Sequence, residues 1–255
     1  MRVALGLLGL AGFGALLEFA PRAGIVPARY APPTSEILAA LGGQAARPGF
    51  WQALGDTLRT WATGLVIAMV AGVVLGVVIG SSPLLRELTA STIEFLRPIP
   101  SVALIPLAVV LYGATRASTL ILVVYAAFWQ VLVQVLHGVA DVDPVARDTA
   151  YSYRLGRWAR VRWLVWPTTL PYAVTGLRLA ASVALILAIT GELVIGSPGL
   201  GREIAIAQTS GAVAPMYALV VVTGLIGVLA NGLARLTERT VLAWHTSVRT
   251  EVAPP

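Results

Sequence analysis

The hydrophobic pattern of this chain consists of long apolar runs, in place of the short alternating or striped patterns of a water-soluble protein. A helix needs about 20 mostly apolar residues to cross the hydrocarbon core of a bilayer, and closed helical hydrogen bonding is what allows a backbone to lie in lipid. The runs therefore predict an all-α integral membrane protein with about six transmembrane helices. Their approximate bounds are 3–20, 57–80, 92–113, 118–138, 170–195 and 213–234.

The chain divides into three parts by this pattern. Residues 1–56 are predicted to hold an N-terminal membrane helix and an external loop, residues 57–240 the helical core, and residues 241–255 a cytoplasmic tail. The first apolar run follows Arg2 in the manner of a secretion signal, but no small-x-small cleavage site follows it and Glu18 interrupts its end. We therefore expect this run to be an uncleaved membrane helix.

Composition supports the membrane assignment, because 57% of the residues are hydrophobic and only 12% are charged. The net charge of +6 comes entirely from arginine, since the chain has no lysine. A basic chain binds either nucleic acid or the anionic face of a membrane, and the apolarity favours lipid over nucleic acid as a partner. The absence of cysteine excludes disulfides, cysteine-based zinc sites and thiol catalysis.

The distribution of arginine predicts the orientation. Segment 139–166 is rich in arginine, and the C-terminal tail carries more. The positive-inside rule then places this segment and both termini in the cytoplasm of a multi-pass protein of the bacterial inner membrane. With six spans, the arginines on the cytoplasmic side are Arg2, Arg86, Arg147, Arg154, Arg157, Arg160, Arg162, Arg235, Arg239 and Arg249, and those outside are Arg22, Arg29, Arg47, Arg116 and Arg202.

Two predicted spans are irregular. Pro98, Pro100 and Pro106 lie within ten residues, and each removes a backbone donor and obstructs the preceding helical turn. This region is either a structural kink or a helix bent around a transport pathway. The stretch 195–201, IGSPGLG, is similarly broken and follows Glu192. This carboxylate either caps a helix end or pairs with arginine across an interface, or it is a functional group within the membrane.

The second span carries small residues every four positions, at Ala68, Gly72, Gly76 and Gly80. Small residues on one helix face allow a neighbouring helix to approach closely. We expect a packing face within the chain, with a contact between subunits as the alternative.

The long cytoplasmic segment is the most informative part of the chain. Asp143 followed by Pro144 is typical of a helix start, since the carboxylate caps and proline suits the first helical position. The helix is predicted to run from Pro144 to about Tyr153, and residues 154–156 to form a turn in which Gly156 takes the left-handed conformation. Such a segment either transmits force to another protein or rests on anionic lipid.

Residues 142–201 resemble the signature region of binding-protein-dependent ABC importer permeases, in the branch that serves nitrate, sulfonate, taurine and thiamine-precursor uptake. The shared motifs lie along most of the chain. They are Asp148-Thr149-Ala150, Trp166-Pro167 with Pro171, Thr175-Gly176-Leu177-Arg178, Gly191-Glu192-Leu193 and Gly199-Leu200-Gly201, with Pro32-Pro33-Thr34-Ser35-Glu36 and Leu96-Arg97-Pro98-Ile99-Pro100-Ser101 further upstream.

Three positions depart from the family pattern. Asp148 stands in place of glutamate, and Trp166 in place of leucine before the first proline. Arg154 occupies the place of the family glycine, and Gly156 follows two residues later. We expect the helix–turn–helix geometry to survive if Gly156 takes over the turn, with altered contacts to the ATPase.

The resemblance implies a type I importer arrangement, in which residues 57–240 form the permease core and a coupling helix at about 144–153 docks on a separate ATPase. The chain itself is not expected to be an enzyme, because a Walker A loop needs lysine; ATP and magnesium would bind to the partner. The implied partners are a second permease subunit, alike or related, two ATP-binding subunits and an extracytoplasmic solute-binding protein. The implied coupling residues are Asp148, Thr149, Ala150, Tyr151, Arg154, Gly156 and Arg157.

The resemblance also implies a pathway between two permease subunits. We expect its walls to include Pro98, Pro100, Ser101, Gln130, Gln134 and Glu192. The solute would be small and polar or anionic, such as nitrate, a sulfonate, taurine or a vitamin precursor, delivered to the loops near residues 22–47 and Arg202. The alternative from another class is a secondary transporter or channel that works without an ATPase; few charges at span centres and no clear internal repeat count against it.

Overall fold

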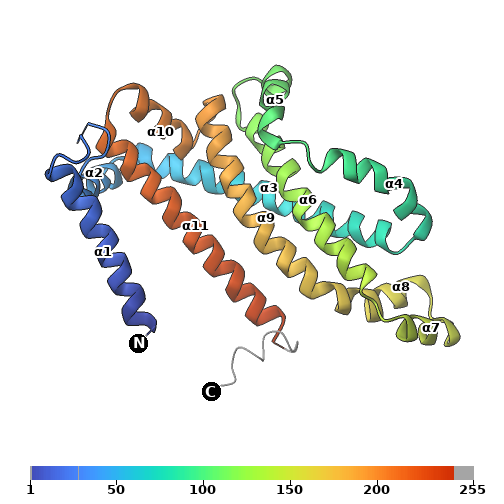
Figure 1. Cartoon of the computed structure of the whole chain (residues 1–255). Helices are drawn as coiled ribbons and strands as arrows, with labels where there is room; N and C mark the ends of the chain where they lie inside the picture. The colour runs from blue at the N-terminus through green and yellow to red at the C-terminus, as the bar shows by residue number, and fades with distance from the viewer. Residues whose placement is uncertain (1, 28, 244–255) are drawn as a thin grey trace.

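The computed structural model describes residues 2–27 and 29–243, which form helices and connecting turns with no strand among them (Figure 1). The predicted tail beyond residue 243 lies outside the described residues. The helices are α1 (Arg2–Arg22), α2 (Thr34–Ala45), α3 (Pro48–Gly80), α4 (Pro83–Leu96), the 3-10 helix η1 (Ser101–Leu104), α5 (Ile105–Tyr112), α6 (Arg116–Ala140), α7 (Pro144–Ser152), α8 (Arg157–Arg160), the π-helix η2 (Val161–Val165), α9 (Trp166–Ile195), α10 (Leu200–Thr209) and α11 (Val213–Val241).

Four helical stretches of the described chain are long and apolar enough to cross a membrane: α3, α6, the continuous run from α8 to α9, and α11. The predicted span 92–113 is not one continuous helix, which corrects its bounds, while the kink predicted from its prolines is confirmed. The chain there forms α4 and the η1–α5 pair, bent by 83° at the Pro98–Pro100 break. Six helical units therefore follow one another in the predicted order among the described residues: α1, the four long stretches, and the bent pair counted as one unit.

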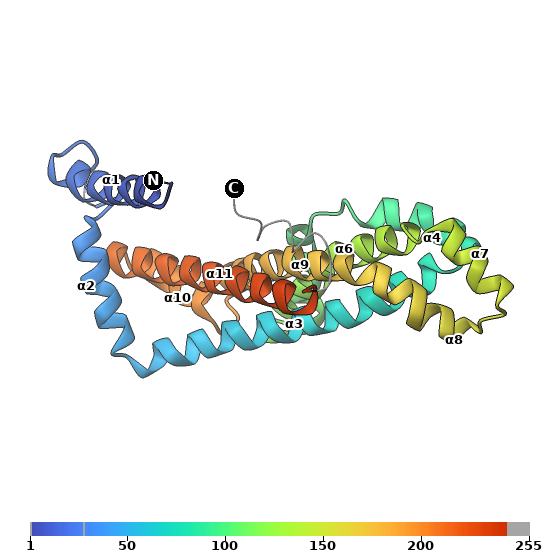
Figure 2. The same cartoon turned by 90° about the horizontal axis from the view of Figure 1, so that it is seen from below.

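The centre of the molecule is formed by α3, α6 and α9, with α10 and α11 packed against α9 (Figures 1 and 2). The buried residues there are mostly alanine, valine and leucine, such as Val131, Val135 and Ala184. Small side chains allow close helix packing where lipid supplies no hydrophobic driving force. The close packing of α3, α6 and α9 determines how these three helices are oriented relative to one another.

The small residues of α3 pack against valines of α6 in a constant register. A Cβ atom added at Gly72 would lie 2.7 Å from the Val131 Cβ. At Gly76 and Gly80 the added Cβ would lie 2.8 Å from the Cβ of Val135 and of Val139 in turn. Each pair is separated by 59 residues (131 − 72, 135 − 76 and 139 − 80), so α3 and α6 run parallel. The prediction of a packing face within the chain is confirmed.

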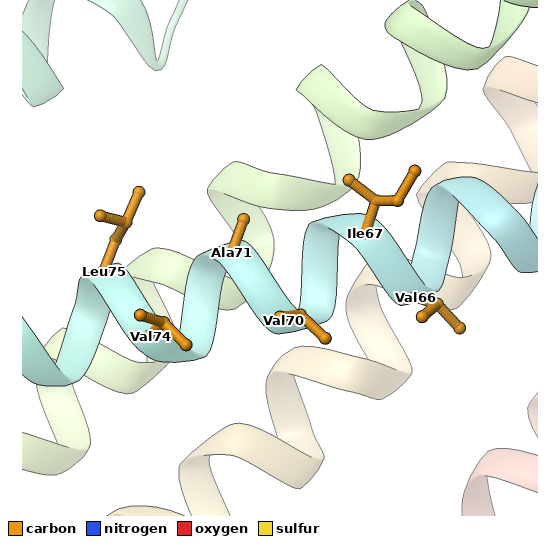
Figure 3. Close-up of a pocket in the computed structure, with 6 residues that line it drawn as sticks. All are labelled: Val66, Ile67, Val70, Ala71, Val74 and Leu75. Atoms are coloured by element: carbon orange, nitrogen blue, oxygen red, sulfur yellow. The ribbon is translucent and has the colours of Figure 1, made fainter.

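The outer side of α3 is a shallow apolar groove (Figure 3). Its lining consists only of hydrophobic side chains, so it suits lipid or another apolar helix. The residues are Val66, Ile67, Val70, Ala71, Val74 and Leu75.

The two ends of the bundle differ. Helices α2 and α10 lie at one end, and α7 and α8 extend from the other (Figures 1 and 2). The start of α1 and the end of α11 point toward the end that carries α7. The loops predicted to be external and those predicted to be cytoplasmic are thus separated by the length of the spans.

Candidate functional site

Helix α7 begins as its sequence predicts. The Asp143 carboxylate accepts a hydrogen bond from the Val145 backbone N–H at 2.7 Å, and Pro144 fills the first helical position, where an N–H would have no partner. The helix ends at Ser152, one residue short of the predicted bound. A short, capped helix therefore projects beyond the spans, joined to them by two turns (Figure 2).

The turn after α7 corrects the sequence interpretation. Arg154, and not Gly156, takes the left-handed conformation, with φ of 53° against −59° at Gly156. The Leu155 N–H donates to the Ala150 carbonyl and the Arg154 N–H to the Tyr151 carbonyl, which is a Schellman ending with Arg154 at the left-handed position. The left-handed residue is the second one after Ser152, the last residue of α7, so the end of the helix determines which residue adopts this conformation. Gly156, two residues later, is not involved.

Most of the residues implied in coupling lie on the surface of this projection. Asp148, Thr149, Tyr151, Arg154, Gly156 and Arg157 are exposed. Ala150 is different, since it is only 5% exposed and faces the protein. The Arg160 guanidinium lies 4.1 Å from the centre of the Tyr151 ring, which holds α8 against α7. The role of these residues in coupling stays a prediction.

Both ends of the projection are fixed to spans. The Tyr172 hydroxyl of α9 donates to the Asp141 carboxylate at the end of α6, at 2.9 Å. Three residues earlier on α6, a Cβ at Gly138 would lie 2.9 Å from the Thr169 Cα, so the two backbones are in close contact. A displacement of α7 would therefore move the ends of α6 and α9 together.

The π-helix η2 explains how the chain remains helical from α8 into α9, past Pro167. Pro167 has no N–H to donate, and its ring crowds the carbonyl four residues earlier in an α-helix. The wider turn of η2, directly before Trp166, removes this conflict. The run from α8 to α9 is consequently one continuous helical stretch of 39 residues, from Arg157 to Ile195, which contains a segment apolar enough to cross a membrane and begins before the predicted residue 170.

The residues predicted to line a pathway fall into three separate places. Pro98 and Pro100 are exposed at the bend between α4 and η1, and Ser101 is half-buried there. Gln130 and Gln134 are half-buried on α6, next to Gly176 of α9. Glu192 lies at the end of α9. Their role in a pathway stays a prediction.

Glu192 is fully buried and holds the start of α10. Its Oε2 accepts hydrogen bonds from the Thr57 hydroxyl at 2.8 Å and from the Gly201 N–H at 3.0 Å. The Thr57 hydroxyl in turn accepts from the Leu200 N–H at 2.9 Å. Two orphan donors of the α10 N-terminus are thereby satisfied, and the other carboxylate oxygen, Oε1, is buried without a partner among the described residues.

The glycines of the IGSPGLG stretch allow this approach. A Cβ at Gly199 would overlap the Glu192 carboxylate, and one at Gly201 would overlap the Ile189 carbonyl. Gly196 ends α9 with φ of 78°. Beside this stretch, the buried hydroxyls of Thr119 and Ser197 lie 2.7 Å apart. The broken stretch is thus a tight connection that seats α10 on α3 and α9.

Sequence reasoning missed several polar residues at this end. Thr57 and Thr119 lie in apolar runs, 135 and 73 residues before Glu192 (192 − 57 and 192 − 119), and no local pattern links them to it. Asp56 forms an ion pair with Arg116 at the start of α6 and a longer contact, 3.9 Å, with Arg59. The separation of the partners along the chain explains why only the structure reveals the cluster.

These observations describe an all-α chain, over its described residues, with several helices long and apolar enough to cross a membrane. The chain belongs to the family of binding-protein-dependent transport system inner membrane components, the permeases of ABC importers; the family model matches residues 64–242. The match includes α7, the turn at Arg154, and the Glu192 connection.

Relatives agree with this membership. The taurine transport system permease protein of Escherichia coli (strain K12) is 31% identical over 226 residues, which cover 86% of this chain and 82% of that protein. The nitrate import permease protein of Leptolyngbya laminosa is 27% identical over 184 residues, covering 72% of this chain and 66% of that protein. The fold is similar to a chain of a bacterial ABC transporter involved in the import of alginate, with a TM-score of 0.67, 14% identity, and coverage of 94% and 96%.

Proposed function

We propose that this chain is the permease subunit of an ATP-driven importer for a small anion of the taurine, sulfonate or nitrate type. A second permease subunit, alike or related, would complete the pathway. Two ATP-binding subunits would bind ATP and magnesium and contact α7 of the two permease subunits. An external binding protein would deliver the solute to the end that carries α2 and α10. Both termini would lie in the cytoplasm.

The observation that carries the proposal is the construction of α7. It is capped at Asp143, exposed on most of its surface, and connected through Asp141 and Tyr172 to both α6 and α9. A loop that only rests on lipid needs no such connection. A partner that moved α7 would tilt two spans of the core at once, and two copies moving in opposite directions would open the pathway to one side or the other.

The arginine distribution supports the orientation, and the relatives support the solute. Segment 144–166 carries five arginines and one acidic residue, Asp148, which is the asymmetry expected of a cytoplasmic segment. One relative is named for taurine transport and another for nitrate import. Taurine carries a sulfonate group, so the two solutes share an oxyanion.

Reconstitution tests this proposal. The full chain is placed in liposomes with the ATP-binding subunit that co-purifies with it and its binding protein, and ATP-dependent uptake of labelled taurine and nitrate is measured. Reversing charge with Asp148→Arg or Arg157→Glu is expected to weaken docking by about 1.4 kcal/mol, a tenfold loss of affinity for the ATP-binding subunit, and so to lower uptake. Arg235→Gln, an exposed arginine on α11, serves as the matched control.

Two outcomes would overturn the proposal. Uptake by the chain alone, with no response to ATP, would instead identify a secondary transporter or channel. Unchanged uptake and ATP hydrolysis in both charge-reversed variants would show that α7 is not where the ATPase docks.

A further inference from the structure

Arg178 is the only arginine within the last three predicted spans, 118–138, 170–195 and 213–234, and the chain has no lysine. It lies well inside α9, 12 residues from the start of the helix and 17 from its end (178 − 166 and 195 − 178). Ionisable residues inside membrane helices are rare, and they mostly face the interior of a bundle or an aqueous pathway. The surroundings of Arg178 therefore show what it can bind.

The ion-pair partner of Arg178 is Glu238 of the neighbouring helix α11 (Figure 1). Arg178 Nη1 lies 3.8 Å from Glu238 Oε2, which is beyond hydrogen-bond distance. A guanidinium has five N–H donors, and in residues 2–27 and 29–243 no acceptor takes a hydrogen bond from this one. Since 42% of the Arg178 side chain is exposed, these donors remain available to a further acceptor.

The open face of α9 around Arg178 carries hydroxyl groups. Thr175 and Ser182 lie three residues before and four after Arg178, spacings that share one helix face, and both are exposed. Leu179 and Ile186 are exposed between and beyond them. The groove on α3, by contrast, is lined by apolar side chains alone (Figure 3). The α3 groove thus suits lipid, whereas the open face of α9 suits a pathway that contains water.

We propose that Arg178 binds the oxyanion group of the solute as it crosses the permease, in exchange for its contact with Glu238. This adds a binding residue to the proposed function and rests on it. A guanidinium is planar and binds two oxygens of a carboxylate or phosphate through parallel hydrogen bonds. A sulfonate or nitrate offers a similar pair of oxygens.

The Glu238 carboxylate limits how tightly the solute is held. A transport site must bind well enough for the solute to enter and weakly enough for it to leave. Glu238 competes with the solute for the guanidinium, so it weakens binding and promotes release. The two partners of this ion pair therefore have opposite effects on anion binding, whereas a pair that only joined α9 to α11 would make them equivalent.

Anion binding to single variants separates these roles. Labelled taurine or nitrate is titrated onto the full-length permease with its co-purifying ATP-binding subunit, in nanodiscs and without the binding protein. Arg178→Gln should weaken binding about tenfold or more, and Arg178→Lys, which lacks the planar fork, about three- to fivefold. Glu238→Gln should strengthen binding about three- to fivefold, because the competing charge is gone, and should slow ATP-driven uptake. Arg235→Gln, an exposed arginine on α11, is the matched control and should stay within about twofold.

A charge exchange separates anion binding from the stability of the fold. The double variant Arg178→Glu with Glu238→Arg restores an ion pair between α9 and α11 but removes the cation from α9. Thermal unfolding of this variant should be close to that of the unsubstituted chain, while anion binding should stay as weak as in Arg178→Gln. Recovery of binding by the exchange would contradict the proposal.

Three further results would overturn it. The first is equal effects of Arg178→Gln and Glu238→Gln on binding, and the second is no measurable anion binding by the unsubstituted complex. The third is loss of that binding when the nanodiscs contain anionic lipid, which would show that a lipid phosphate occupies the guanidinium. Unaltered ATP-driven uptake by Arg178→Gln would leave the proposed function standing without this site, whereas uptake that needs no ATP would remove both.

Discussion

At the residue scale, Glu192 shows how a carboxylate can exist within an apolar span. Its Oε2 accepts two hydrogen bonds, from Thr57 and Gly201, and so connects α3, α9 and α10. These two partners offset part of the cost of burying the carboxylate, while Oε1 is buried without a partner among the described residues. The geometry supports a local role in seating α10, and a role in the pathway would require Oε1 to meet a further group.

Substitution of Glu192 separates these two roles. Glutamine retains an oxygen for Thr57 and Gly201, so Glu192→Gln should change stability little. Alanine leaves both donors buried without an acceptor and opens a cavity, so Glu192→Ala should lower the unfolding free energy by about 2–4 kcal/mol. Thermal unfolding in nanodiscs measures both. A folded Glu192→Gln variant that no longer transports would instead show that the charge itself is needed.

At the scale of elements, the contact between α3 and α6 depends on glycine. The Cβ of an alanine at position 72 would lie 2.7 Å from the Val131 Cβ and 3.2 Å from the Leu132 backbone nitrogen, which cannot rotate away. The two helices would therefore have to separate over several turns.

This contact makes a quantitative prediction. Gly72→Ala should destabilise the protein by about 1–3 kcal/mol, the usual cost of overpacking, and Val131→Gly in the same chain should recover part of that loss. The double variant would then be more stable than the sum of the single changes. Gly224→Ala is the matched control, because its Cβ meets nothing within 4 Å on α11. Additive effects of the two changes would contradict the direct contact.

The same elements show what the sequence could predict. The start of α7 and the packing face of α3 depend on residues four or fewer positions apart, so local patterns suffice. The turn at Arg154 depends on the residue at which α7 ends, and a glycine nearby led to the wrong position. The prolines around Pro98–Pro100 predict a break but not its angle of 83°, and the Glu192 cluster depends on contacts between distant segments, which no local pattern records.

At the scale of the whole molecule, the Asp141–Tyr172 hydrogen bond connects the projection to the bundle. Tyr172→Phe removes only the donor hydroxyl. Binding of the ATP-binding subunit should stay unchanged, while solute taken up per ATP hydrolysed should fall about two- to fivefold, as expected for one hydrogen bond of roughly 0.5–1 kcal/mol. Reconstituted uptake and hydrolysis, measured together, give this ratio.

The matched control removes a similar bond at the other end. The Tyr217 hydroxyl donates to the Tyr30 carbonyl at 2.9 Å, so Tyr217→Phe loses a hydrogen bond of the same length as Asp141–Tyr172. It should leave the ratio of uptake to hydrolysis unaltered. An equal fall in both variants would mean that the loss reflects general loosening, and not transmission through α6 and α9.

The constant spacing of 59 residues between the glycines of α3 and the valines of α6 limits how this protein can diverge. Adding or deleting one residue between Gly72 and Gly80 would turn the rest of α3 by about 100°, because a helix has 3.6 residues per turn. Valine, leucine or isoleucine side chains would then face α6 at the positions where glycine has no side chain. Descendants of this chain can thus change length in the connections outside the bundle, whereas within this stretch they must exchange residues one for one.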